Sequence, residues 1–255
     1  MNAPRFFCDL PLASGMEVDL PEAVARHAAQ VLRLPPGAAV TLFNGRGGEY
    51  PAVLSLTGKA RARARLGEWR DVERESPLRV TLAQAAQTAD KMDFSLQKAV
   101  ELGVRIFQPL ASRRSVMRLS GERQQKRESH WQAVALAACE QCGRNRPPEI
   151  FPIKPLEDWL IQEGRTLPGW KLLFTPEAET GLSAWARTKN AVQEVTLLIG
   201  AEGGLDAQEI AAARASGFLP LCLGPRILRT ETAGVAALAV LQNLWGDLGT
   251  GDNAP

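Results

Sequence analysis

Two glycine-bearing loops in the last quarter of the chain carry the residues best placed to do chemistry. Residues 200–204 read Gly-Ala-Glu-Gly-Gly, and residues 224–232 contain Arg226, Arg229 and Glu231. Glycine lets a ligand approach the backbone closely, and apolar residues surround both loops. The pattern predicts a ligand held by backbone groups and apolar walls. Ordinary strand-to-helix connections of an α/β protein remain the alternative.

Neither loop matches a nucleotide-phosphate motif. No Gly-Lys-Ser/Thr follows, as a Walker A loop requires, and Gly200, Gly203 and Gly204 do not form G-x-G-x-x-G. Nucleotide phosphates are therefore a poor match for this site.

Each loop follows a predicted strand and opens a predicted helix. The apolar runs at 195–199 and 219–223 predict buried strands. Asp206 and Glu209 have the spacing of a capping box, and a long apolar helix is expected from 233 to about 245. In open α/β sheets the ligand crevice lies outside the carboxyl ends of the strands, which is where both loops fall.

Strands and helices also alternate upstream of these loops, which favours a parallel sheet. The sequence predicts strands at 79–85, 105–110 and 170–175, and helices at 92–102 and 122–142.

The two loops belong to two long motifs. Residues 197–204 read Leu-Leu-Ile-Gly-Ala-Glu-Gly-Gly, and residues 223–233 read Leu-Gly-Pro-Arg-Ile-Leu-Arg-Thr-Glu-Thr-Ala. In this order they resemble the signature of the SPOUT methyltransferases, and most closely the RsmE-type branch, which methylates N3 of a uridine in small-subunit ribosomal RNA. The resemblance extends to residues 33–37, 98–103 and 140–148. One departure is Ala201, where the family usually has proline.

The resemblance implies an α/β fold: a C-terminal SPOUT-type parallel sheet with a deep trefoil knot, plus a small N-terminal PUA-like β-barrel. It also implies S-adenosylmethionine as cofactor and a homodimer. The sulfonium of this cofactor already activates the methyl group, so no metal is expected. The residues that the resemblance assigns to cofactor binding are Phe174, Thr175, Ile199, Gly200, Gly203, Leu223, Gly224, Ile227, Leu228 and Thr230.

The acceptor that the resemblance implies needs help from the protein. N3 of uracil is an imide nitrogen that attacks well only as the anion. A cation near the uracil carbonyl oxygens would stabilise that anion. Arg229 is the first candidate and Arg144 the second, while Glu231 could orient an arginine or accept the proton. Ordinary salt bridges, and for Glu231 a helix cap, remain alternatives.

Composition limits the class of protein. The chain has 255 residues and 45% hydrophobic residues, which predicts one large or two modest domains. No run of eighteen apolar residues exists, so no membrane contact is expected. The start of the chain lacks a signal-peptide core, and the four cysteines are expected as reduced thiols of a cytoplasmic protein. Cys139 and Cys142 have no second pair, so no metal site is predicted.

Shifts in pattern divide the chain into a small β-rich domain at residues 1–72, an α/β domain at 73–248 and a polar tail at 249–255 that is expected to be disordered. The resemblance implies that the first is the PUA-like RNA-binding domain and the second the methyltransferase domain. Within the first domain a helix is expected at 21–33, and Asn-Gly-Arg-Gly-Gly at 44–48 predicts a hairpin.

A basic surface is expected to contact RNA. In a strand, Lys59, Arg61, Arg63 and Arg65 would share one face, with alanines on the other. Residues 76–148 hold 12 Lys and Arg against 6 Asp and Glu. Such a surface suits a polyanion, although a merely solvated face is about as plausible. The residues assigned to RNA binding are Lys59, Arg61, Arg63, Arg65, Arg113 and Arg114, and the expected partner is small-subunit ribosomal RNA, free or in the assembled subunit.

Two other function classes stay open at this point. One is an RNA-binding module whose SPOUT domain has lost catalysis, which the intact Arg226, Arg229 and Glu231 disfavour. The other is a nucleotide-dependent oxidoreductase, which the missing dinucleotide fingerprint disfavours.

Overall fold

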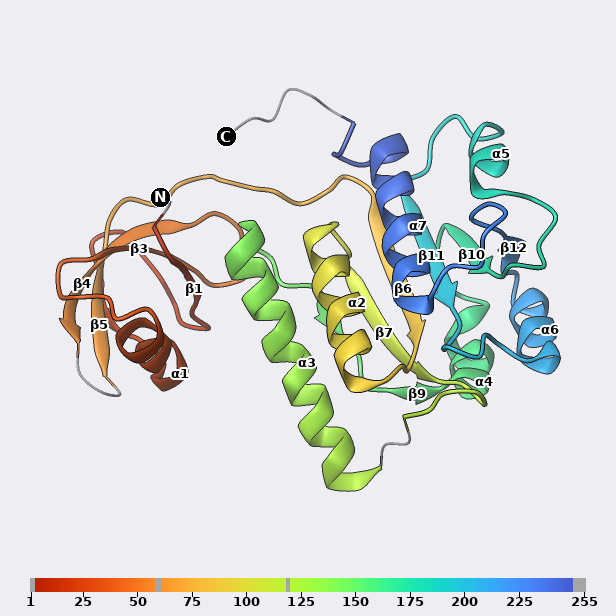
Figure 1. Ribbon diagram of the computed structural model, residues 1–255. Helices are drawn as coiled ribbons and strands as arrows, with labels where there is room; N and C mark the ends of the chain where they lie inside the picture. The colour runs from red at the N-terminus through yellow and green to blue at the C-terminus, as the bar shows by residue number, and fades with distance from the viewer. Residues whose placement is uncertain (1–2, 58–60, 118–119, 250–255) are drawn as a thin grey trace. The chain divides into compact units, whose positions relative to one another are not determined.

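The computed structural model describes residues 3–57, 61–117 and 120–249. It divides into two compact units, the first made of residues 1–75 and 136–147 and the second of residues 76–135 and 148–255 (Figure 1). Residues 136–147, expected in the second domain, thus group with the first unit. The domain boundary expected at 72/73 stays a prediction, and almost all of the expected tail lies outside the described residues.

A five-stranded sheet forms the body of the first unit. Its order is β1-β3-β4-β5-β2, with β1 parallel to β3 and the other pairs antiparallel. The elements are β1 (Arg5–Phe7), β2 (Glu17–Asp19), α1 (Glu22–Arg26), the π-helical η1 (His27–Val31), β3 (Ala39–Phe43), β4 (Tyr50–Thr57) and β5 (Ala62–Leu66). The predicted hairpin joins β3 to β4, and the helix expected at 21–33 changes to π-helix after Arg26 and ends at Val31.

The alternation predicted for residues 59–65 is confirmed from Ala62 on, where β5 begins; Arg61 precedes the strand and Lys59 lies outside the described residues. Ala62 and Ala64 are buried, whereas Arg63 and Arg65 are exposed. The alanines belong to a core that includes Phe6, Leu42 and Leu54. Small inward residues on β5 leave room for α1, which packs against this strand.

A parallel sheet forms the centre of the second unit, as predicted. The strand order is β12-β10-β11-β6-β7-β8, and β9 also pairs with β7. The strands are β6 (Arg79–Ala85), β7 (Ile106–Ala111), β8 (Glu149–Ile150), β9 (Lys154–Pro155), β10 (Trp170–Phe174), β11 (Glu194–Ile199) and β12 (Leu219–Leu221). β11 is buried from Val195 to Ile199, because helices cover both faces of the sheet.

Helices connect these strands. They are α2 (Ala89–Glu101), α3 (Gly121–Cys142), α4 (Leu156–Trp159), the π-helical η2 (Leu160–Gly164), α5 (Leu182–Ala186), α6 (Ala207–Ala215) and α7 (Thr230–Trp245). The capping box predicted for α6 is confirmed, since the N–H of Glu209 donates to Asp206 Oδ1 over 2.8 Å and the N–H of Asp206 donates to Glu209 Oε2 over 2.9 Å. α7 begins at Thr230 rather than at the expected Ala233. No helix within the described ranges is long and apolar enough to cross a membrane.

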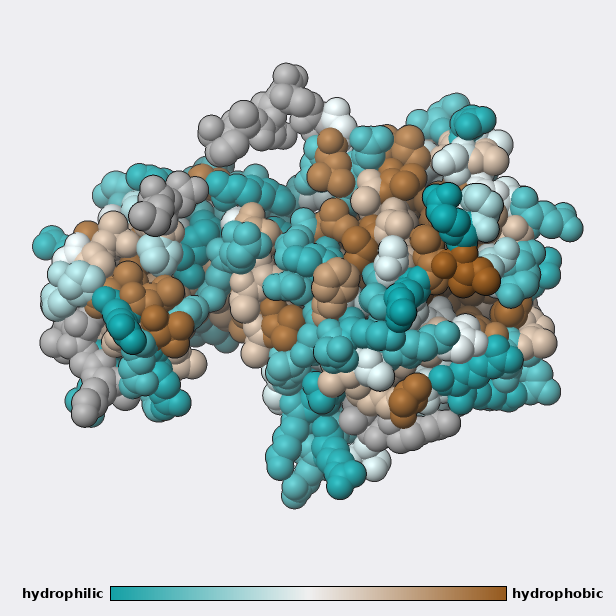
Figure 2. All heavy atoms as spheres, in the orientation of Figure 1, coloured by the Kyte–Doolittle hydropathy of each residue, from teal (hydrophilic) through white to brown (hydrophobic). Residues whose placement is uncertain are grey.

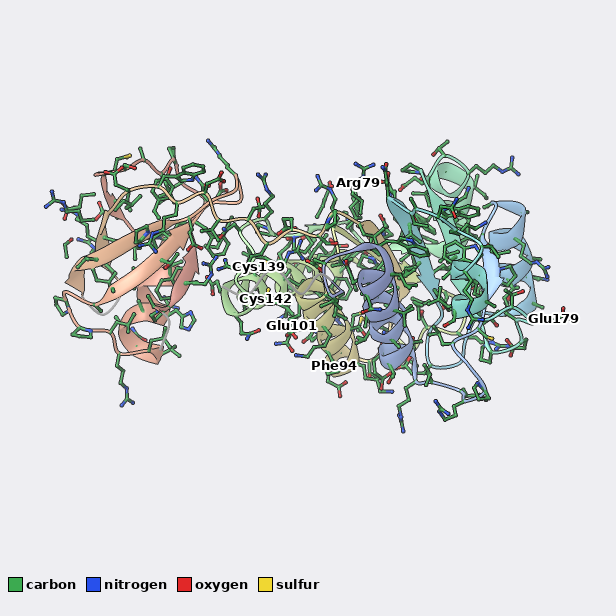
Figure 3. The ribbon with its side chains drawn as sticks, turned by 90° about the horizontal axis from the view of Figure 1, so that it is seen from above. Arg79, Phe94, Glu101, Cys139, Cys142 and Glu179 are labelled. Atoms are coloured by element: carbon green, nitrogen blue, oxygen red, sulfur yellow. The ribbon has the colours of Figure 1, made fainter. Side chains whose placement is uncertain are left out.

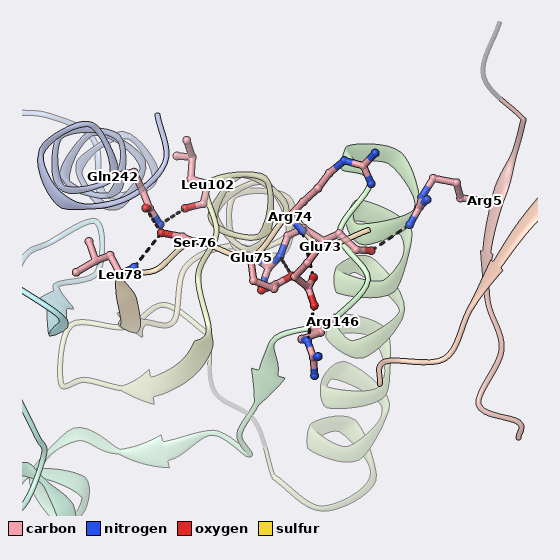
Figure 4. Close-up of polar contacts among 10 residues, drawn as sticks. Arg5, Glu73, Arg74, Glu75, Ser76, Leu78, Leu102, Arg146 and Gln242 are labelled. Atoms are coloured by element: carbon pink, nitrogen blue, oxygen red, sulfur yellow. Dashed lines mark hydrogen bonds and ion pairs between the residues drawn. The ribbon is translucent and has the colours of Figure 1, made fainter. Parts of the chain in front are cut away.

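The C-terminal half of α7 is tied to the rest of the second unit by Gln242 (Figure 4). Its Nε2 donates to the carbonyl of Leu102, at the end of α2, over 2.8 Å, and its Oε1 accepts from the hydroxyl of Ser76 over 2.6 Å. A Cβ on Gly103 would lie 2.8 Å from Gln242 Nε2, so only glycine fits there without displacing the amide. These contacts fix α7 against α2.

Candidate cofactor-binding site

A cavity of about 440 Å³ lies at the carboxyl ends of β10, β11 and β12. This volume suits a small molecule or cofactor. Figure 2 shows apolar side chains near the N-terminal end of α7, where Ile227 is 84% exposed. The cavity is lined by all ten residues that the sequence analysis assigned to cofactor binding: Phe174, Thr175, Ile199, Gly200, Gly203, Leu223, Gly224, Ile227, Leu228 and Thr230.

The loop between β12 and α7 offers its backbone to the cavity. In the described part of the chain, the backbone N–H and C=O groups of residues 223–228 make no hydrogen bond to another protein group. Gly224 has a φ of +105°, and a Cβ there would meet no atom within 4 Å. The loop therefore presents unpaired donors and acceptors beside open space, which a polar ligand can satisfy.

The loop between β11 and α6 is held in place by side chains from other elements. Glu202 Oε1 accepts from the N–H of Thr88 over 3.2 Å and lies 3.5 Å from Lys91 Nζ, both at the start of α2. Arg114 Nη1 donates to the carbonyl of Gly203 over 2.7 Å. The loop is thus ordered by the protein itself, which lowers the cost of ordering it around a ligand.

The glycines of this loop have two different roles. A Cβ on Gly200 would lie 2.9 Å from the carbonyl carbon of Gly204 and 3.0 Å from the nitrogen of Leu205, so the loop's own backbone requires glycine there. Gly204 has a φ of +70° and open space around its Cβ position. Only Gly204 and Gly224 therefore fit the expectation that glycine makes room for a ligand.

Glu177 and Glu231 bring negative charge to the cavity lining. Glu231 lies in the first turn of α7, where the helix dipole favours a negative charge, and its Oε2 is buried without a hydrogen-bond partner among the described residues. The hydroxyl of Thr175 donates to Glu177, which lowers the pKa of that exposed carboxyl. Both groups favour a ligand that carries positive charge.

Two arginines border the same cavity. Arg226 and Arg229 are exposed, and neither guanidinium has an ion pair or hydrogen bond with the residues that the structure describes. Their donors are therefore available to an electron-rich second ligand next to the cavity.

Arg144, the second predicted catalytic candidate, is not among the residues that line this cavity. It belongs to the first unit, where it is 4% exposed. Its Nε and Nη2 donate to the two carboxylate oxygens of Glu75, and this pairing raises its pKa although burial opposes that effect. The structure thus gives Arg144 a structural ion pair within the first unit.

The predicted RNA-binding residues differ in their surroundings. Arg63 donates two hydrogen bonds to Asp19, at 2.9 and 3.2 Å, which neutralises part of the β5 face. Arg113 is ion-paired with Glu157 and Asp206. Arg114, as described above, holds the carbonyl of Gly203. Arg61 and Arg65 are exposed, and Lys59 lies outside the described residues.

The two most buried cysteines are poor nucleophiles. Burial is the main cause that raises the pKa of Cys8 to about 12, and the same holds for Cys139. Both thiols therefore stay protonated at neutral pH. Cys142 and Cys222 are half-buried and also free.

The sequence resembles known proteins along nearly its whole length. Residues 74–242 match the RNA methyltransferase domain and residues 20–66 the RNA methyltransferase PUA domain. The ribosomal RNA small subunit methyltransferase E of Buchnera aphidicola subsp. Schizaphis graminum is 32% identical over 247 residues, which are 96% of this chain and 98% of that protein. The chain belongs to the ribosomal RNA small subunit methyltransferase E family.

Two solved methyltransferase structures have the same fold as this chain. A methyltransferase from Legionella pneumophila in complex with the bound cofactor SAM has a TM-score of 0.91 and 35% identity, covering 97% of this chain and 100% of its own. Ribosomal RNA small subunit methyltransferase E from Neisseria gonorrhoeae, bound to S-adenosyl methionine, has a TM-score of 0.87 and 38% identity with the same coverage. These similarities confirm the methyltransferase fold and the PUA domain, and they support neither the inactive module nor the oxidoreductase.

Several residues that line the cavity were not assigned to cofactor binding or catalysis from the sequence. They are Lys91, Leu173, Pro176, Glu177, Ala201, Glu202, Gly204, Leu205, Ile210, Arg226 and Ala233, while Arg114 was assigned to RNA. Glu202 and Gly204 lie inside the quoted motif, and Glu177 follows Thr175 by two residues, so proximity along the chain could have indicated them. Lys91 and Arg114 come from distant segments, and no local pattern points to them.

Proposed function

We propose that this chain transfers a methyl group from S-adenosylmethionine to N3 of a uridine in small-subunit (16S) ribosomal RNA. One observation carries the proposal: in this family member the cavity is lined by five residues of the loop 223–228, whose backbone groups have no partner among the described residues. The adenine edges and the amino-acid end of the cofactor offer the donors and acceptors that such a loop lacks.

The residues present fit this cofactor. Ile199, Leu223 and Leu228 supply apolar walls, while Glu177 and Glu231 supply negative charge that suits a sulfonium. When bound, the cofactor supplies a methyl group that is already activated. What the protein must add is alignment and a deprotonated acceptor.

We assign the acceptor chemistry to Arg229 and Glu231. The Arg229 guanidinium, unpaired among the described residues, would stabilise negative charge on the uracil oxygens as N3 loses its proton. Glu231, whose Oε2 is buried without a described partner, would accept that proton or orient Arg229. The ion pair of Arg144 with Glu75 favours a structural role for Arg144, which stays the second candidate.

The partners follow from the same proposal. Ribosomal RNA is the substrate, and Arg61 and Arg65 of the first unit contact its phosphates. We also propose a homodimer that uses the packed pair α2 and α7, since Phe94 on α2 is 45% exposed (Figure 3). A cytoplasmic location, independence of metal and the trefoil knot belong to the proposal as well.

The test is methyl transfer by the purified chain. Small subunits and naked 16S ribosomal RNA are incubated with the cofactor, with and without a chelator, and the nucleosides are analysed by mass spectrometry. We expect N3-methyluridine at one position, with the chelator having no effect. RNA from a strain lacking the gene should lose that nucleoside and regain it on complementation. Unchanged nucleosides in that strain would reject the proposal, and methylation of a different atom would reject the assigned acceptor.

A further inference from the structure

A glutamine just outside the cavity joins the two cofactor loops. Gln84 lies near the carboxyl end of β6, is 0% exposed and does not line the cavity. Its Nε2 lies 3.1 Å from Thr230 Oγ1, 3.4 Å from the carbonyl oxygen of Gly200 and 3.2 Å from the carbonyl oxygen of Ala85. One amide group thus contacts the end of β6, the loop after β11 and the first residue of α7.

The carbonyl of Gly200 is the shared point of these contacts. It accepts from the hydroxyl of Thr230, and Gln84 Nε2 lies 3.4 Å from it. The amide has two hydrogens for three acceptors, so its shortest contact, to Thr230 Oγ1, orients the hydroxyl that in turn sets the direction of the Gly200 peptide plane. The backbone that enters the residue 200–204 loop is therefore oriented from outside the cavity.

Packing alone does not explain an amide at this position. Gln84 Oε1 is buried and has no hydrogen-bond partner among the described residues. It faces Gly234 of α7, where a Cβ would lie 3.4 Å away. Burying an acceptor without a partner destabilises a fold, so an apolar side chain of equal size would serve a purely structural role better. What the amide provides is its donor.

We propose that Gln84 is a positioning residue for S-adenosylmethionine, acting through the Gly200 carbonyl and the Thr230 hydroxyl. This inference rests on the proposed function. Without the amide donor, the Gly200 peptide and the start of α7 are free to turn independently. The two loops that border the cavity then lose their shared orientation, and the cofactor must restore it on binding.

The neighbouring strand offers a matched control. Gln108 on β7 is also a buried glutamine whose Oε1 has no partner within the described ranges. Its Nε2 donates to the carbonyls of Pro109 and Pro152, over 2.8 and 3.0 Å, and it does not line the cavity. Gln84→Met and Gln108→Met therefore remove the same group from two equally buried sites, of which only one contacts the cofactor loops.

The experiment compares cofactor affinity, melting temperature and methyl transfer across these variants of the full chain. We expect Gln84→Met to weaken S-adenosylmethionine binding at least tenfold in calorimetry, and to raise the cofactor KM more than it lowers kcat. The cofactor affinity of Gln108→Met should stay within twofold of that of the wild type, even if its melting temperature falls as much as that of Gln84→Met.

Thr230 provides a second route should Gln84→Met fold poorly. Thr230→Val should weaken cofactor binding, whereas Thr230→Ser, which keeps the hydroxyl, should restore most of it. The double variant Gln84→Met/Thr230→Val should lose less cofactor affinity than the product of the two single-variant losses, because both side chains act on the Gly200 carbonyl.

Equal cofactor affinities for the wild type and Gln84→Met would overturn the inference. Equal losses of affinity for Gln84→Met and Gln108→Met would overturn it as well. If the wild type itself binds no cofactor, the proposed function fails instead.

Discussion

The hydroxyl of Thr230 donates a hydrogen bond to the carbonyl oxygen of Gly200, 30 residues earlier in the chain. Thr230 is the first residue of α7, and Gly200 directly follows β11. The contact therefore closes one side of the cavity by joining the beginning of a helix to the end of a strand. It also places Glu231, the next residue, in the first turn of the helix beside the cavity.

Gly200 should be intolerant of any side chain, for a reason unrelated to ligand contact. A Cβ would approach the backbone of Gly204 and Leu205 within 3.0 Å, so we expect Gly200→Ala to lower stability by about 1 to 3 kcal/mol and cofactor affinity with it. Gly234→Ala is the matched control, because its Cβ would meet only ordinary contacts at 3.4 to 3.6 Å and alanine favours a helix. Thermal unfolding and calorimetry measure both quantities. A Gly200→Ala protein of normal stability would contradict the loop geometry.

Arg229 should matter for transfer far more than for binding. Removing one preorganised donor to a developing negative charge costs about 3 to 4 kcal/mol, so Arg229→Ala should lower the single-turnover rate roughly 10² to 10³-fold at saturating cofactor and RNA. The rate of the variant should keep rising to higher pH than that of the wild type, because the imide then lacks a cation that makes it more acidic. Identical pH profiles with near-normal rates would remove Arg229 from the mechanism.

Arg61, just before β5, and the two arginines of β5, Arg63 and Arg65, should contribute unequally to RNA binding. Arg61→Ala and Arg65→Ala should each flatten the slope of log affinity against log salt by up to about one unit, whereas Arg63→Ala should change it less because Asp19 already pairs with Arg63. Asp19→Asn should release Arg63 and steepen the slope. Equal effects of all three arginine substitutions would mean that the Arg63–Asp19 pair opens on RNA binding at no cost.

Stability should fall at alkaline pH because of two buried thiols. Burial raises the pKa of Cys8 and Cys139 from 9.0 to about 12. Between these values the unfolded chain releases the thiol protons while the folded protein keeps them, so rising pH favours unfolding by about 1.4 kcal/mol per pH unit per thiol. Denaturant unfolding between pH 8 and 11 should give a shallower decline for Cys8→Ala than for the wild type. Parallel curves would show that the Cys8 thiol titrates normally.

Arg33 should be replaceable by glycine with a gain in stability. It is the one non-glycine residue with positive φ (51°) in the described part of the chain, at the point where the N–H of Leu34 bonds to the carbonyl of Ala28 over 2.9 Å. Glycine is the usual residue at such a helix end. We expect Arg33→Gly to raise the unfolding free energy by about 0.5 to 1 kcal/mol. The control Arg26→Gly, at the last residue of α1 where the chain continues as η1 and the side chain pairs with Glu22, should lower it by about 1 kcal/mol. A loss of stability in Arg33→Gly would mean that the arginine side chain makes a stabilising contact.

The sequence by itself determined the parts of this protein that depend on neighbours along the chain. β6 begins and ends at the predicted residues, the hairpin forms at the Asn-Gly turn, and the box at Asp206 caps α6. The alternation of β5 follows from the period of a strand. Eight of the ten residues proposed to bind the cofactor lie in the two contiguous motifs at 197–204 and 223–233, and the ends of adjacent parallel strands bring such motifs to one edge.

The tertiary structure alone decided which charged groups and hydrogen-bond donors are already paired within the protein. Arg63 pairs with Asp19 from 44 residues away, and Arg113 bonds to Asp206 from 93 residues away, so neither is the free cation that its neighbours in sequence suggest. Gln84 reaches Thr230 across 146 residues. Hydrophobic period and turn chemistry act over a few residues, whereas the partner of a buried or paired polar group depends on which strands lie side by side. That order, with β11 between β6 and β10, exists only in the folded sheet.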